Sequence, residues 1–94
     1  MSKIADKVTE LAEPIVKDFG CTLYKVKYLK EGPDYYLRVF IEKESGVGIN
    51  DCENISKALD PILDREDVIP NAYVFEVSSS GEERERDEKN KKEV

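Results

Sequence analysis

The side chains that most often perform acid–base or nucleophilic chemistry are scarce in this 94-residue sequence. It contains no histidine, which is the commonest general base and metal ligand at neutral pH. The serines at positions 78–80 therefore have no imidazole base for a hydrolytic triad. No two carboxylates stand out by their spacing as an acid–base pair, and the segment 46–48 lacks the spacing and the lysine of a phosphate-binding loop. We therefore expect no enzymatic activity, no cofactor and no small-molecule substrate.

The two cysteines predict neither a metal site nor a disulfide framework. Cys21 and Cys52 are far apart in the sequence, outside any CxxC pair and without companion ligands. Free, largely buried thiols in a reducing compartment are the simplest interpretation. The N-terminus has no long apolar run, so we expect no signal peptide and no membrane span, and a cytoplasmic location.

The charge balance is acidic. The sequence has 21 acidic against 15 basic residues, a formal net charge of −6, whereas a chain held by phosphate contacts is usually basic. Acids gather on two predicted helices, where they form either an ordinary solvated surface or a docking surface for a basic partner. The candidate partner-binding residues are Glu10, Glu13, Asp51, Glu53, Asp60 and Asp64.

A second candidate surface combines aromatic and basic side chains. If the strand registers hold, these residues lie on the sheet face opposite the core, where single-stranded RNA binders stack bases and contact phosphates. Ordinary cross-strand pairing, or self-association through the bare sheet face or the edge of the third strand, explains the same pattern. The candidate RNA-binding residues are Lys25, Lys27, Tyr36, Arg38 and Phe40.

Two amphipathic helices position the acids. Apolar residues recur at helical spacing from Ile4 to Phe19 and again from Cys52 to Leu63. Each predicted helix contains a proline, Pro14 in the first and Pro61 in the second. A helical wheel places both prolines away from the apolar stripe and therefore in solvent. Ser2 is the expected N-cap of the first helix, and Asn50 with Glu53 is the expected capping pair of the second.

Three strands complete the pattern. Apolar and polar residues alternate over 22–29 (with Tyr24, Val26 and Tyr28 on the core face), 35–42 and 73–77, and a Gly-Pro-Asp turn joins the first two runs into a hairpin. The order α-β-β-α-β predicts an α+β domain, residues 1–81, with two helices packed on one face of a three-stranded sheet. Residues 82–94 are rich in charge and poor in apolar side chains, so we predict a disordered tail.

The sequence resembles the N-terminal domain of the bacterial ribosome maturation factor RimP over about residues 4–84. The most specific segments are Asp51-Cys52-Glu53, Leu59-Asp60-Pro61 and the run from Ile69-Pro70 to Glu76-Val77-Ser78-Ser79. The resemblance implies a cytoplasmic, non-catalytic factor that binds the small ribosomal subunit, or one of its basic proteins, during late maturation.

The resemblance weakens at its C-terminal end. Family members usually continue through a Ser-Ser-Pro-Gly-Leu-Asp-Arg linker into an SH3-like barrel, whereas here Ser80 replaces the proline and Glu82 the leucine. Serine gives up the extended exit that a Ser-Pro step favours, and glutamate gives up an apolar docking residue. The sequence covers the first domain alone, either as a truncated product with a divergent end or as a lone relative that no longer needs the second domain.

Overall fold

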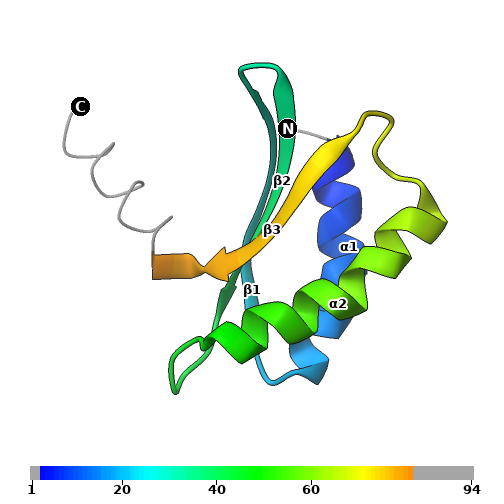
Figure 1. Ribbon diagram of the computed structural model, residues 1–94. Helices are drawn as coiled ribbons and strands as arrows, with labels where there is room; N and C mark the ends of the chain where they lie inside the picture. The colour runs from blue at the N-terminus through cyan, green and yellow to red at the C-terminus, as the bar shows by residue number, and fades with distance from the viewer. Residues whose placement is uncertain (1–2, 82–94) are drawn as a thin grey trace.

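The helices and strands follow one another in the order predicted from the sequence. The computed structural model describes residues 3–81, in which α1 (Lys3–Asp18) precedes the hairpin of β1 (Thr22–Glu31) and β2 (Asp34–Glu42) (Figure 1). They are followed by α2 (Ile49–Glu66) and β3 (Tyr73–Ser79). The predicted N-cap Ser2 and the predicted tail lie outside the described residues.

The central strand of the sheet is β2. The strand order is β1-β2-β3, in which β1 pairs with β2 antiparallel and β3 pairs with β2 parallel. Parallel pairing requires a crossover connection, and α2 supplies it. Both outer strands are consequently edges, and the register aligns Lys27, Arg38 and Glu76 across all three strands.

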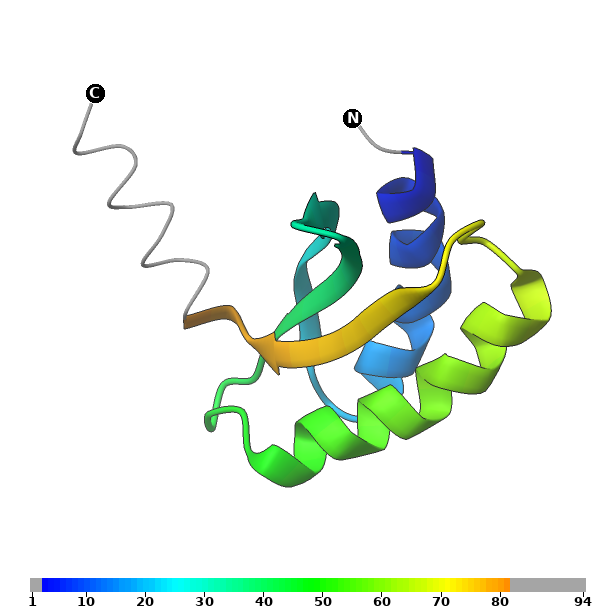
Figure 2. The ribbon, with the colours of Figure 1, turned by 45° about the horizontal axis from the view of Figure 1, so that its top comes forward.

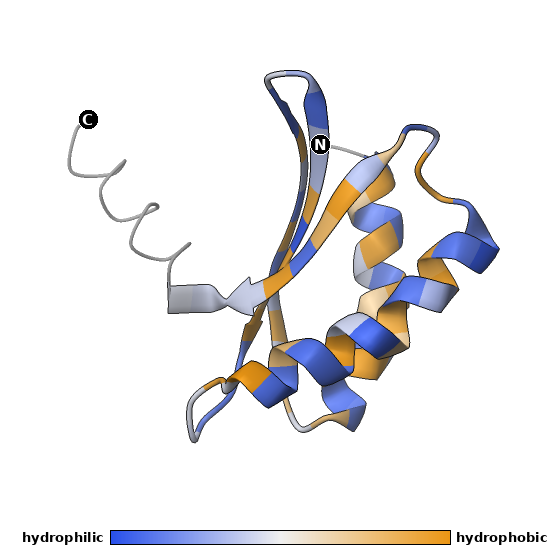
Figure 3. Cartoon of the chain, in the orientation of Figure 1, coloured by the Kyte–Doolittle hydropathy of each residue, from blue (hydrophilic) through white to orange (hydrophobic). Residues whose placement is uncertain are grey.

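The core lies between the helices and one face of the sheet. Alternate residues of β2, namely Leu37, Val39 and Ile41, are fully buried, as the predicted alternation requires. The two helices contribute one apolar stripe each, and the stripes turn toward the sheet while charged residues face outward (Figure 3). The buried stripe residues are Val8, Ala12, Val16, Ile55, Leu59 and Leu63. The prediction of two helices on one face of a three-stranded sheet is therefore confirmed.

Both helical prolines lie on the outside. Pro14 is inside α1 and Pro61 is inside α2, and both side chains are exposed, as the wheel predicted. An internal proline removes one helical hydrogen bond. At these positions the apolar stripe keeps its phase across the proline, so each helix still buries one continuous side. The predicted stripe is wrong at its last residue, because Phe19 follows the end of α1 and is 38% exposed.

The predicted core face of β1 is wrong at one residue. The register passes from the pair Leu23–Ile41 directly to Lys25–Phe40, so Tyr24 is the extra residue of a β-bulge. A bulge shifts the alternation by one position. Leu23, Val26 and Tyr28 therefore pack against the core cluster, and Tyr24 does not share that face.

The predicted N-cap of α2 is also wrong. The helix begins at Ile49, so Asn50 already lies inside it and Gly48 takes the cap position. The Gly48 N–H donates to Asp51 Oδ2 at 2.9 Å, which is the reciprocal half of a capping box. Gly48 has no side chain to mark it as a cap, so only the acid three residues later gave a signal.

Candidate partner-binding surfaces

Three of the predicted docking acids share one side of α2. Glu53, Asp60 and Asp64 are exposed and fall within about 40° of one another at about 100° per residue. This side borders β3, because Glu53 and Val77 line opposite walls of one groove of about 250 Å³. We call Glu53, Asp60 and Asp64 the α2 acids.

Two of the α2 acids act electrostatically on Tyr73 at the start of β3. The pKa of the Tyr73 hydroxyl is raised, first by burial and then by the negative charges of Asp64 and Asp60. Coulombic effects of this kind require proximity. The α2 acids therefore extend along β3, with Asp60 and Asp64 near Tyr73 at its start and Glu53 near its end.

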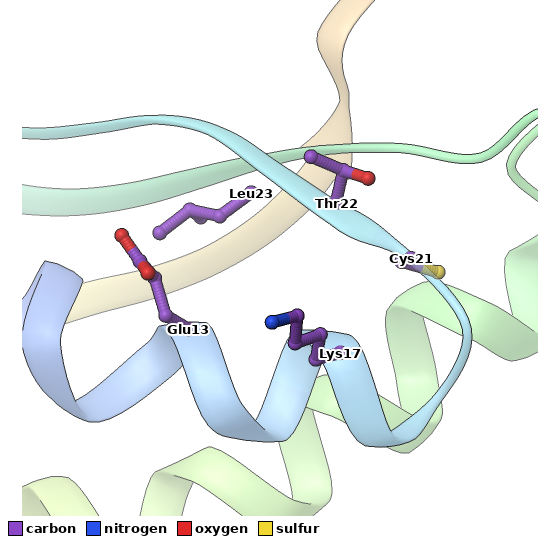
Figure 4. Close-up of a pocket in the computed structure, with 5 residues that line it drawn as sticks. All are labelled: Glu13, Lys17, Cys21, Thr22 and Leu23. Atoms are coloured by element: carbon purple, nitrogen blue, oxygen red, sulfur yellow. The ribbon is translucent and has the colours of Figure 1, made fainter.

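The α1 acids lie elsewhere. Glu13 lines a cavity of about 280 Å³ between α1 and β1, together with Lys17 and Leu23 (Figure 4). Glu10 lies three residues earlier on the same helix and approaches Lys7, with 3.9 Å between Oε2 and Nζ. Because α1 packs on β1 and α2 packs on β3, the predicted acidic surface is divided between opposite flanks of the helical layer.

Asp51 belongs to neither group of acids, because it is engaged inside the domain. Its side chain is only 18% exposed, and it accepts hydrogen bonds from the Gly48 N–H and from Lys43 Nζ, the latter at 3.1 Å. These two hydrogen bonds, the one from Gly48 foremost, lower the pKa of the Asp51 carboxyl. Asp51 thus joins the loop after β2 to the first turn of α2.

The lowered pKa of Asp51 gives stability that acid removes. A carboxyl whose pKa is lower in the folded chain binds its proton more weakly there than in the unfolded chain. The ionised Asp51 carboxylate therefore stabilises the fold above its unfolded pKa of about 3.9, and this stabilisation is lost as pH falls through its folded pKa. We expect urea unfolding of Asp51→Asn to show a shallower loss of stability below about pH 4 than the unchanged chain. Glu53→Asn, an exposed change on the same helix, should leave that acid slope unaltered, and equal slopes for all three chains would refute the assignment.

The face of the sheet opposite the core has an organised centre. Arg38 Nε donates to Glu76 Oε1 at 3.1 Å and its Nη2 donates to Glu31 Oε1 at 2.6 Å. The guanidinium carbon lies 4.7 Å from the centre of the Tyr36 ring, within cation–π range. The hydrogen bond that Arg38 donates to Glu31 is the largest cause of the raised pKa of Arg38. Two carboxylates therefore already accept hydrogen bonds from the guanidinium that was predicted to contact phosphate.

Phe40 is not available for stacking, contrary to the sequence-based expectation. Its place on β2 puts it on the face opposite the core, but its side chain is only 3% exposed. In the central strand it lies between Lys25 on β1 and Ser78 on β3. Tyr36, Lys25 and Lys27 share this face with it. The predicted aromatic and basic residues therefore lie on one face of the sheet, but the ring of Phe40 is buried and cannot stack on a base.

The thiols are both free. Cys21 is buried and Cys52 is half-buried. Burial is the main cause that raises the pKa of each thiol, and the negative charge of Asp51 adds to both. A raised pKa lowers the fraction of reactive thiolate at neutral pH, which is the behaviour of structural cysteines.

Sequence reasoning missed two features of the surface. Ile49 at the start of α2 is 82% exposed, and Val74 on β3 is 43% exposed. Periodicity had suggested neither, because both positions depend on what the neighbouring elements leave uncovered. Over residues 3–81 the structure shows no cluster of three or more metal-ligating side chains, and none of the helices described is long and apolar enough to cross a membrane.

A family model described as the RimP N-terminal domain matches residues 11–83. The match begins inside α1 and takes in α2 and all three strands. It confirms the resemblance inferred from the sequence segments.

Proposed function

The chain belongs to the RimP N-terminal domain family, and from its role in ribosome maturation we propose a more specific activity. We propose that the domain binds the small ribosomal subunit, or one of its basic proteins, in the cytoplasm during assembly. It acts as a binding module without catalysing a reaction. The contact surface is formed by the α2 acids, Glu53, Asp60 and Asp64.

One observation carries this proposal: the α2 acids are carboxylates without an internal partner. Within residues 3–81 none of the three forms an ion pair, whereas Glu31 and Glu76 are held by Arg38 and Asp51 is held by Lys43. Three exposed carboxylates on one side of a helix, with Lys57 as the one basic residue beside them, attract a positively charged partner and speed its encounter. Lys57 is the only basic residue among those that line the adjoining groove.

Single-stranded RNA is the less favoured partner. The burial of Phe40 removes one stacking ring, and the two carboxylates on Arg38 compete with phosphate for its donors. The overall charge of −6 also opposes a phosphate backbone. The observations therefore favour a basic protein surface.

Charge reversal on α2 tests the proposal. We expect Asp60→Lys with Asp64→Lys to weaken binding to purified small subunits by about tenfold or more, because attraction becomes repulsion at the contact. The affinity of the unchanged chain should fall with added salt, because salt screens exposed charges. Sedimentation of labelled protein with small subunits measures both effects.

The matched control changes the same charge on the opposite flank. Glu10→Lys with Glu13→Lys alters the net charge equally but leaves α2 untouched, so binding should change by less than about threefold. Equal weakening by both pairs would show a response to net charge alone. Full binding by the α2 variant would overturn the proposed surface.

A further inference from the structure

The two edges of the sheet differ in how they are protected. Edge strands commonly avoid unwanted pairing through lysines, prolines or bulges. β1 has a bulge next to Leu23 and three lysines, Lys25, Lys27 and Lys30. β3 pairs with β2 over seven consecutive residues without a register shift, and it contains no lysine and no proline.

The one charged residue of β3 pairs with the neighbouring strand β2 and not with the outer edge. Glu76 is the only acidic residue of the strand, which contains no basic residue, and Arg38 donates a hydrogen bond to it. Over residues 3–81, no backbone hydrogen bond joins β3 to any element other than β2. Alternate N–H and C=O groups along its outer side are therefore available to a further strand.

The surroundings of this edge are negatively charged and grooved. α2 runs beside β3 (Figure 2), and the groove of about 250 Å³ between them is lined by Glu53, Lys57 and Val77 among others. A second hollow of about 150 Å³ lies at the start of the strand on its β2 side, where Asp34 and Tyr35 line it with Tyr73. Asp60 and Asp64 lie on the same side of α2 as Glu53, and their negative charges act on Tyr73 at the start of β3. Side chains of an added strand would find the groove between α2 and β3 beside them.

We infer that the outer edge of β3 accepts an extended basic segment of the partner as a fourth strand, with the α2 acids neutralising its lysine or arginine side chains. This inference rests on the proposed function and adds its binding mode. Main-chain hydrogen bonds supply affinity and the flanking acids select a basic sequence, as in other cases of strand addition. A second copy of this chain is the poorer occupant, because it would bring its own α2 acids and a charge of −6 to the same edge.

Amide hydrogen exchange on the full 94-residue chain tests the binding mode. The probe is a short synthetic peptide in which arginine and valine alternate. We expect it to slow the exchange of alternate amides of β3 by about tenfold or more, while amides of the β1 edge keep their rates. Protection that is absent from β3, or equal on β1 and β3, would overturn the inference.

Backbone methylation of the peptide separates this inference from the proposed function. N-methylation at alternate residues removes donors but keeps every positive charge, so it should weaken binding by about tenfold. If Asp60→Lys with Asp64→Lys abolishes binding while N-methylation does not, the acidic surface stands and strand addition fails. If neither change matters, both fail. Dimers in sedimentation equilibrium that the peptide does not dissociate would assign the edge to a second copy and overturn the inference.

Discussion

Replacement of Val39 by aspartate is expected to unfold the domain at neutral pH. Val39 is fully buried in the central strand, on the face that packs against both helices. The change forfeits roughly 1.5–3 kcal/mol of side-chain burial and places in the core a carboxylate whose desolvation costs several kcal/mol more. Together these terms approach the whole stability of a small domain, about 5–15 kcal/mol. Far-ultraviolet circular dichroism and dispersion of amide resonances measure the loss.

Val74→Asp is the matched control. The substitution is identical, but Val74 is 43% exposed on the edge strand β3. Water continues to solvate the new carboxylate there, so the free energy of unfolding should change by no more than about 1 kcal/mol. A folded Val39→Asp variant with a sharp thermal transition would contradict the assigned sheet face.

Truncation of Ile55 is expected to cost roughly 2–5 kcal/mol of the free energy of unfolding. Ile55 is fully buried where α2 meets the core, so Ile55→Ala removes apolar contacts and leaves a cavity that the neighbouring side chains fill only in part. For a domain of this size, each 1 kcal/mol lowers Tm by about 4–8 °C. Urea unfolding monitored by circular dichroism gives the difference directly.

Ile49, an exposed isoleucine of α2, provides the matched control for Ile55→Ala. Ile49 is 82% exposed, so Ile49→Ala should change the free energy of unfolding by no more than about 0.5 kcal/mol. The comparison isolates burial from helix propensity, because both changes replace isoleucine with alanine in α2. Equal losses at the two positions would show that packing against the sheet does not stabilise α2.

Most of the fold could be predicted from the sequence because burial is periodic. The stripes from Ile4 to Val16 and from Cys52 to Leu63 follow the helical repeat, and the alternation around Leu37, Val39 and Ile41 follows the strand repeat. The outward position of both helical prolines follows from the same geometry. These properties depend on residues near one another in the chain.

The sequence-based predictions of the β1 core face and of the α2 N-cap failed because each depends on a single irregular residue. The bulge at Tyr24 moves Leu23 onto the core face, and Gly48 begins α2 without a side chain that marks a cap. A local pattern predicts alternation or capping by residue type, whereas the pairing partner across the sheet determines where an extra residue is inserted.

The sequence by itself determined the elements, their order, the core face of β2 and the chemical character of the main surfaces. Only the tertiary structure decided which charges remain available, because pairing depends on distances between segments far apart in the chain. It engages Arg38 with Glu31 and Glu76, encloses Phe40 in the central strand, and ties Asp51 to Lys43. It also separates the acids of α1 from those of α2, which leaves Glu53, Asp60 and Asp64 beside an open strand edge.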